Sequence, residues 1–206
     1  MTPAQAAIVR AAKEQGIDPA FALAVAARES NFNPTARASK TIRGMFQMRG
    51  DLRAKYGIGD SDDPYQQAAG WGQFIGGVKK DMRGVLGRDP TDEEAYLGHH
   101  FGARRAARML LDDPNTPVDA VFTPQEMALN PHFGKAGTVG ALNSSVIADI
   151  DRRKSQFGGQ TSLPDLSSLG EAVAPPDLSS LGDPVEQQAS RSAPAAPDLS
   201  SLGELV

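Results

Sequence analysis

The sequence predicts a mainly α-helical fold, followed by a C-terminal segment that builds no core. Three observations favour this class. Helix-start signals recur along residues 1–157, strand signals are scarce, and the composition changes after Phe157. With 206 residues, of which 40% are hydrophobic and 22% charged, the chain is long enough for one domain with a core of ordinary size.

Each expected helix begins at a capping residue, often followed by proline. Thr2 and Gln5 form a capping box ahead of a helix that Gly16 can end. Asp18 caps a second, apolar helix that carries Glu29. Asp63–Pro64 predicts a helix over 64–87, although the glycines in this stretch weaken the pattern. Thr91 with Glu94 predicts a helix over 92–111. Thr123–Pro124 predicts a short helix after 124, and Thr138 predicts a helix over 139–157. Residues 35–48 can form at most a small hairpin.

The composition excludes several kinds of protein. The chain has no cysteine, so it has no disulfide framework and no thiolate metal site. No apolar run approaches the roughly 18–20 residues of a membrane span. The N-terminal stretch is no secretory signal, because Arg10, Lys13 and Glu14 interrupt its apolar residues. If the protein acts outside the cytoplasm, we expect a larger assembly to carry it there.

The C-terminal segment, residues 158–206, is an acidic low-complexity tail with seven acidic residues and one basic residue. Because the whole chain carries −4, residues 1–157 carry only +2, which does not fit a nucleic-acid binder. The heptapeptide PDLSSLG occurs three times, at 164–170, 176–182 and 197–203. With so few large apolar residues the tail is expected to be disordered when free. The repeats are either a solvated spacer or docking motifs for an unidentified protein partner.

Glu29 stands where the apolar helix that begins after Asp18 gives way to a turn. On a helix it lies over Val25 and Ala26, in the last turn, where the helix dipole presents negative potential. Apolar surroundings and the dipole both disfavour the charged form of the carboxyl, which suits a general acid in glycosidic cleavage.

The residues around Glu29 resemble a family signature. The stretch from Glu29 to Pro34 is Glu-Ser-x-Phe-Asn-Pro, and Ser39 and the GMFQM stretch at 44–48 follow it. This pattern is similar to that of the lytic transglycosylase family, which has the helical fold of goose-type lysozyme and cleaves peptidoglycan between N-acetylmuramic acid and N-acetylglucosamine. The resemblance implies a lysozyme-like helical domain over residues 1–157 and peptidoglycan glycan strands as the substrate.

The resemblance also implies roles for individual residues. Glu29 is the expected catalytic acid and base, and we expect no metal and no cofactor. The residues expected to bind or position the substrate are Ser30, Ser39, Phe46, Gln47, Met48 and Tyr96. Leu97 stands where the family has asparagine, which leaves the sugar contacts of that position open. The AYLGHHFG stretch resembles the variant of phage-encoded, virion-associated members, so a virion or a secretion or transfer particle is the expected carrier, with the periplasm as the site of action.

The distribution of acids bears on the mechanism. Glycoside hydrolases normally use two carboxylates. In this chain no acidic residue follows Glu29 until Asp51, so a second catalytic carboxylate is not found near the first. In the family a single glutamate suffices, because the muramoyl 6-hydroxyl is the nucleophile and a 1,6-anhydro ring forms without water. The missing second acid favours a lyase. A hydrolytic muramidase or chitinase, an inactive structural protein of a virion or secretion channel, and a DNA-binding regulator remain as alternatives.

The adjacent histidines and three further aromatic residues are expected to have structural roles and no catalytic role. His99 and His100 point about 100° apart on a helix and cannot share a metal ion. They are expected to be neutral surface or packed histidines. Trp71, Phe74 and Tyr65 are expected in the core.

Overall fold

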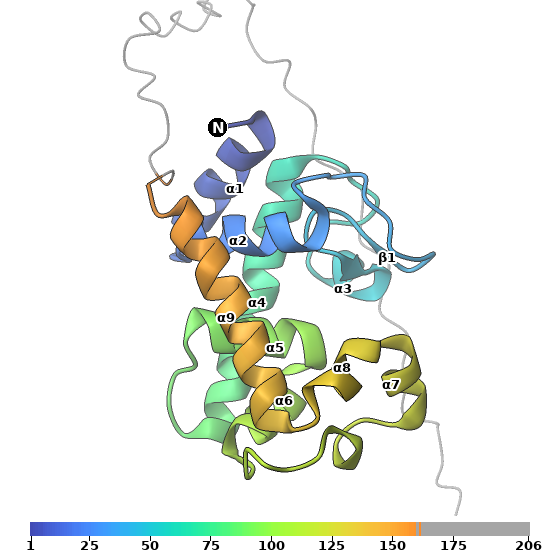
Figure 1. Cartoon of the computed structure of the whole chain (residues 1–206). Helices are drawn as coiled ribbons and strands as arrows, with labels where there is room; N and C mark the ends of the chain where they lie inside the picture. Colours follow the sequence, from blue (N-terminus) through green and yellow to red (C-terminus); the bar gives the residue numbers. More distant parts are fainter. Residues whose placement is uncertain (160, 162–206) are drawn as a thin grey trace, which may run out of the picture. The chain divides into compact units, whose positions relative to one another are not determined.

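The structure, a computed structural model, describes residues 1–159 and residue 161, and this part of the chain is mainly helical (Figure 1). The helices are α1 (Pro3–Glu14), α2 (Pro19–Ser30), α3 (Gly50–Lys55), α4 (Pro64–Leu86), α5 (Asp92–Phe101), α6 (Ala103–Leu111), α7 (Pro124–Leu129), α8 (Pro131–Ala136) and α9 (Val139–Phe157), with a 3₁₀ turn η1 at Val118–Ala120. An antiparallel hairpin joins β1 (Ile42–Arg43) to β2 (Met48–Arg49). The predicted mainly α class with a small hairpin is confirmed.

The predicted start signals act through hydrogen bonds. Thr2, Thr91 and Thr123 each form a complete capping box with the third residue of the helix that follows. The carboxylates of Asp18 and Asp63 accept hydrogen bonds from backbone N–H groups in the first turns of α2 and α4. These local contacts satisfy the free N–H groups of a helix start, so the starts could be predicted from sequence.

The single helix expected over 92–111 is wrong, because the chain breaks at Gly102. This residue has φ 87° and ψ 136°, which is incompatible with a continuing helix and is readily adopted only by glycine. Helices α3 and α8 were not predicted.

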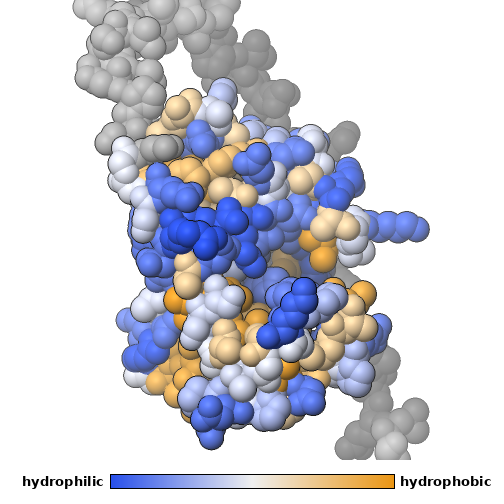
Figure 2. All heavy atoms as spheres, viewed as in Figure 1, coloured by the Kyte–Doolittle hydropathy of each residue, from blue (hydrophilic) through white to orange (hydrophobic). Residues whose placement is uncertain are grey.

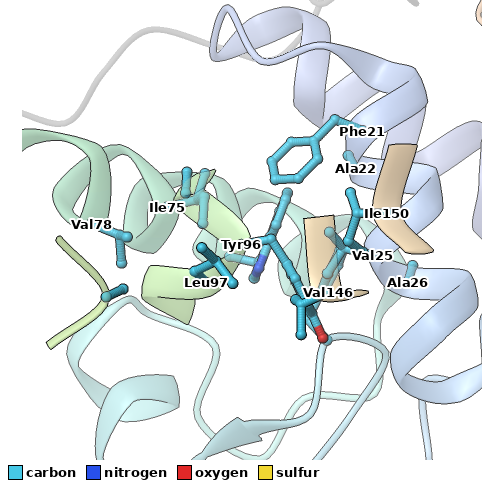
Figure 3. Close-up of a cluster of buried hydrophobic side chains, with 14 of the residues drawn as sticks. Phe21, Ala22, Val25, Ala26, Ile75, Val78, Tyr96, Leu97, Val146 and Ile150 are labelled. Carbon is cyan, nitrogen blue, oxygen red and sulfur yellow. The ribbon is translucent and has the colours of Figure 1, made fainter. Parts of the chain in front are cut away.

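Helix α2 is central to the fold. All seven residues from Ala20 to Ala26 are buried, and the helix packs against α9 and α1. Figure 3 shows Phe21 and Val25 of this helix meeting side chains of α4, α5 and α9 in one cluster, which includes Tyr96. A helix enclosed on so many sides is held by apolar burial, so the residues at its C-terminal end have well-defined positions.

Two further expectations concern membrane-spanning helices and the C-terminal repeats. Within the described residues, no helix has both the length and the apolar character needed to cross a membrane. The three PDLSSLG repeats lie outside the described residues. Both interpretations of the repeats, a spacer or docking motifs, therefore stay predictions.

Candidate active site

Glu29 lies in the last turn of α2 and faces a cleft of about 470 Å³. The side chain is 16% exposed. The cleft is bounded by the end of α2, the hairpin, α3, α4 and α5, and by the residue that joins α7 to α8. The helix ends at Ser30, one residue after Glu29, because Asn31 takes the left-handed conformation, with φ 52°. The carboxyl therefore sits at the junction of a rigid helix and an open space.

Tyr96 of α5 is the immediate partner of Glu29. It is fully buried, and its hydroxyl donates a hydrogen bond to Oε1 of Glu29. Burial, and then the charge of Glu29, raises the pKa of Tyr96, so the hydroxyl keeps its proton and remains a donor.

The hydroxyl of Tyr96 is itself held by Arg28. The Nε of Arg28 donates to this oxygen at 2.7 Å, and the guanidinium forms an ion pair with Asp149 of α9. Burial lowers the pKa of Arg28, but Tyr96, Asp149 and Glu29 together outweigh it, so the net shift is upward. A chain of contacts thus runs from Asp149 through Arg28 and Tyr96 to Glu29.

His99 also reaches the carboxyl, and sequence reasoning missed it as a site residue. Its Nε2 lies 3.8 Å from Oε1 of Glu29, and its ring stacks on Tyr96 with centroids 5.5 Å apart. Burial, and then the charge of Arg28, lowers the pKa of His99 to about 4, so the ring is neutral near pH 7. A packed, neutral histidine was expected, but not one lining the cleft. The available signal was its position three residues after Tyr96, on the same face of α5.

Two predicted substrate-binding residues, Gln47 and Met48, line the cleft with Glu29. Gln47 has φ 44°, and its side chain folds back on the hairpin: Oε1 accepts from the N–H of Ala38 at 3.1 Å, and Nε2 donates to the carbonyl of Gly44 at 2.7 Å. The hairpin therefore has a fixed shape on the side that faces the carboxyl.

Hydrogen bonds from two further side chains also hold the hairpin in place. The hydroxyl of Ser30 donates to the carbonyl of Met45 at 2.9 Å, and Oε1 of the buried Gln67 accepts from the N–H of the same residue at 2.7 Å. Gly44 is required here, because a Cβ would lie 2.4 Å from Nη1 of Arg53. Sequence reasoning did not identify Gln67 or Arg53, because their partners are distant in the chain.

Four of the six predicted substrate-binding residues are absent from the cleft lining: Tyr96, which contacts Glu29 from the core, and Ser30, Ser39 and Phe46. The hydroxyl of Ser30 is engaged with backbone, and that of Ser39 accepts from the N–H groups of Thr41 and Ile42 in an exposed turn. Phe46 is 2% exposed and stacks on Trp71, with ring centroids 4.4 Å apart. Phe46 therefore has a core position in place of the expected cleft position. Ser30, Ser39 and Phe46 support the hairpin and the turn before it.

The cleft continues along the molecule. A neighbouring cavity of about 620 Å³ shares Arg49, Leu52, Phe74, His99 and His100 with it and extends between α3, α4 and α5. The expectation for Trp71 is confirmed, since it is 1% exposed. Phe74 and Tyr65 are partly buried and pack against the core, and Phe74 also lines both cavities. Because the two cavities share five residues, they form one continuous groove.

Carboxyl groups are few in the groove: Asp81 lines the neighbouring cavity, and Glu29 lines the cleft. Among the residues that line the cleft with Glu29, no other carries a carboxyl group. Asp51 pairs with Arg49, Oδ2 to Nη2 2.9 Å, and lines a separate surface cavity. Leu97 is fully buried, and Asn130, which sequence reasoning missed, provides an amide in the cleft. Within the described part of the chain, no group of three or more potential metal ligands occurs.

The N-terminal part of the chain matches a known protein family. Residues 6–67 match the family model described as "Transglycosylase SLT domain". The matched span runs from α1 into the first turn of α4 and contains Glu29 and Gln47, but it ends before Tyr96 and His99. No curated protein matches the chain.

Proposed function

The chain carries a domain of the lytic transglycosylase family, and on this premise we propose that it cleaves the β-1,4 bond between N-acetylmuramic acid and N-acetylglucosamine in peptidoglycan without using water. Glycan strands would lie along the groove beside Glu29. The products would be a chain ending in 1,6-anhydro-N-acetylmuramic acid and a chain beginning with a free 4-hydroxyl.

Glu29 would act twice. In its neutral form it gives its proton to the glycosidic oxygen, and the bond from that oxygen to C1 of the muramoyl residue breaks. As a carboxylate it then takes the proton of the muramoyl 6-hydroxyl, while the oxygen of that hydroxyl bonds to C1. The proton gained by Glu29 restores the starting state, and no water is consumed.

The observation that carries this proposal is the isolation of Glu29 in the cleft. A hydrolase normally needs a second carboxylate, about 5–5.5 Å away for retention or about 6.5–9.5 Å away for inversion. No second carboxyl group lines the cleft. An internal nucleophile removes the need for one. Tyr96 engages Oε1 of Glu29, so the other carboxyl oxygen is the one that would face the substrate.

The test is product analysis with the full-length protein and purified sacculi. Muropeptides lighter by one water than the hydrolysed products, with no reducing end, are expected. Reducing muramic acid as the main product would reject the lyase and favour the hydrolytic muramidase. A folded protein that releases nothing from any sacculus would favour the inactive structural role.

We also propose that a virion or a secretion or transfer particle carries the protein to the wall. The support is the AYLGHHFG stretch, which resembles the form found in virion-associated members of the family. Mass spectrometry of purified particles from the source should detect the protein. Its repeated absence from such particles would reject this carrier.

A further inference from the structure

A separate cavity of about 500 Å³ lies between α8 and α9 and includes the end of α2. Four cationic side chains and one carboxylate line it, namely Arg28, Lys135, Arg152, Arg153 and Asp149. Figure 2 shows hydrophilic side chains gathered over α9, beside a hollow in the surface. We call this cavity the basic pocket. Its volume is within the roughly 300–1,000 Å³ of sites that hold small ligands.

The basic pocket has more positive charge than its own acid can balance. Asp149 pairs with three guanidinium groups at once, those of Arg28, Arg152 and Arg153. Lys135 adds a fourth cation from α8. The side chain of Asp149 is only 15% exposed and that of Arg28 27%, so salt screens these two charges less than the exposed charges of Lys135 and Arg152. An anionic ligand would reduce the repulsion among these cations.

The pocket adjoins the cleft. Arg28 lines the pocket, and the next residue, Glu29, lines the cleft. On the opposite wall His132 lines the pocket, while Asn130, two residues earlier, lines the cleft. The pocket and the cleft are therefore both bounded by the end of α2 and by residues 130–132.

The chemistry of the pocket indicates its ligand. Guanidinium groups present paired N–H donors that match the two oxygens of a carboxylate. In peptidoglycan each muramoyl residue carries a stem peptide on its lactyl group, and this peptide ends in, and contains, free carboxylates. Resting on the proposed function, we propose that the basic pocket binds the carboxylates of the stem peptide. The enzyme then acts preferentially on strands that keep their peptides.

The first test measures binding without turnover. Full-length protein is titrated calorimetrically with the free stem tetrapeptide, alanyl-γ-glutamyl-diaminopimelyl-alanine. The variant Lys135→Gln/Arg152→Gln removes two exposed cations of the pocket that contact neither Glu29 nor Tyr96. The control Lys13→Gln/Arg108→Gln makes the same change of charge on exposed faces of α1 and α6. Wild type and control should bind alike, and the pocket variant at least about tenfold more weakly.

Two results of this titration would overturn the proposal: no binding to wild type, or equal binding to the pocket variant. Inorganic phosphate is the competing anion. If it binds wild type as tightly as the tetrapeptide and displaces it, the pocket belongs to phosphate-bearing ligands, and the assignment to stem peptides is rejected.

The second test compares sacculi with glycan strands from which an amidase has removed the peptides. The pocket variant should have a raised KM on intact sacculi, unchanged kcat, and wild-type kinetics on stripped strands. An equal effect on both substrates would reject the proposal. An inactive protein that still binds the tetrapeptide would reject the proposed function alone, whereas an active protein that does not bind it would reject the pocket alone.

Discussion

The hydroxyl of Tyr96 donates a hydrogen bond to Oε1 of Glu29, although 67 residues separate the two along the chain. The bond joins the end of α2 to the middle of α5, and the ring behind it is buried in the core shown in Figure 3. Because the core holds the donor in place, one oxygen of the carboxyl has a fixed position before any substrate arrives.

Replacing Glu29 by Gln should abolish most of the activity while the fold survives. The amide has the same shape and still accepts from Tyr96, but it cannot give and then take a proton. We expect kcat to fall by about 10²–10⁴-fold. Release of soluble muropeptides from sacculi measures this. Glu14→Gln, on the exposed face of α1, is the matched control and should keep full activity. A Glu29→Gln protein with more than a tenth of wild-type activity would exclude Glu29 as the acid.

Replacing Tyr96 by Phe should give a milder loss. The ring still fills the core, but Glu29 and Arg28 lose the hydroxyl between them. A buried donor without its acceptor costs about 1–3 kcal/mol, so we expect a lower free energy of unfolding together with a fall of about tenfold or more in kcat. Tyr65→Phe removes an exposed hydroxyl that binds Glu14 and should change neither quantity. Equal activity of Tyr96→Phe and wild type would remove Tyr96 from the site.

Arg28 should act on catalysis through Tyr96. Its Nε–H holds the hydroxyl oxygen of Tyr96, which directs the hydroxyl proton toward Glu29. A double-mutant cycle tests this order: Arg28→Gln should lower kcat in the wild type but have little further effect in the Tyr96→Phe background. Additive effects of the two changes on kcat would show that Arg28 acts independently of Tyr96.

His99 should make the fold sensitive to acid. Its pKa is about 4 in the folded protein, against an ordinary value of about 6.5 when unfolded. Between these values the unfolded chain binds a proton that the folded chain does not. The stabilisation from neutral His99 is therefore complete above about pH 6.5 and is lost as the pH falls toward 4, by about 3 kcal/mol.

The variant His99→Phe isolates this effect. The new ring keeps the aromatic contacts with Tyr96 and Phe74 but cannot bind a proton. Urea unfolding at a series of pH values should give a flatter dependence of the free energy of unfolding for the variant than for wild type. Parallel curves would mean that His99 is not the titrating group.

Local signals account for what the sequence could predict. The side chains of Thr2, Asp18 and Asp63 cap helices through neighbours two or three residues away, so the starts of α1, α2 and α4 follow from short patterns. The family signature likewise lies within 20 residues of Glu29, and it indicated both the carboxyl and Gln47. The break at Gly102 was missed because a glycine inside a helical pattern does not by itself reveal its φ.

Long-range packing decided the rest. Phe46 was expected in the cleft on the family pattern, but Trp71 of α4 offers a stacking partner that draws it into the core. His99 and Asn130 line the cleft because the fold places α5 and the α7–α8 junction beside the end of α2. Neither residue has a neighbour in sequence that reports this contact.

The last prediction concerns two glycines of α4, Gly76 and Gly70, which differ in their surroundings. Nothing lies within 4 Å of a Cβ added at Gly76. Alanine is the better helix former by about 1 kcal/mol, so Gly76→Ala should raise the free energy of unfolding by up to that amount. Gly70 faces the loop after α3, and a Cβ there would lie 2.3 Å from Cγ1 of Ile58 and 2.7 Å from the carbonyl oxygen of Tyr56.

At Gly70 the clash should outweigh the gain in helix propensity. The backbone of Tyr56 cannot move aside without shifting the segment that Arg53 binds through the carbonyls of Gly59 and Ser61. We therefore expect Gly70→Ala to lower the free energy of unfolding by about 1–3 kcal/mol, although the same substitution at Gly76 raises it. Urea denaturation of the two variants measures the difference. If Gly70→Ala were as stable as Gly76→Ala, the close packing of α4 on this loop would be refuted.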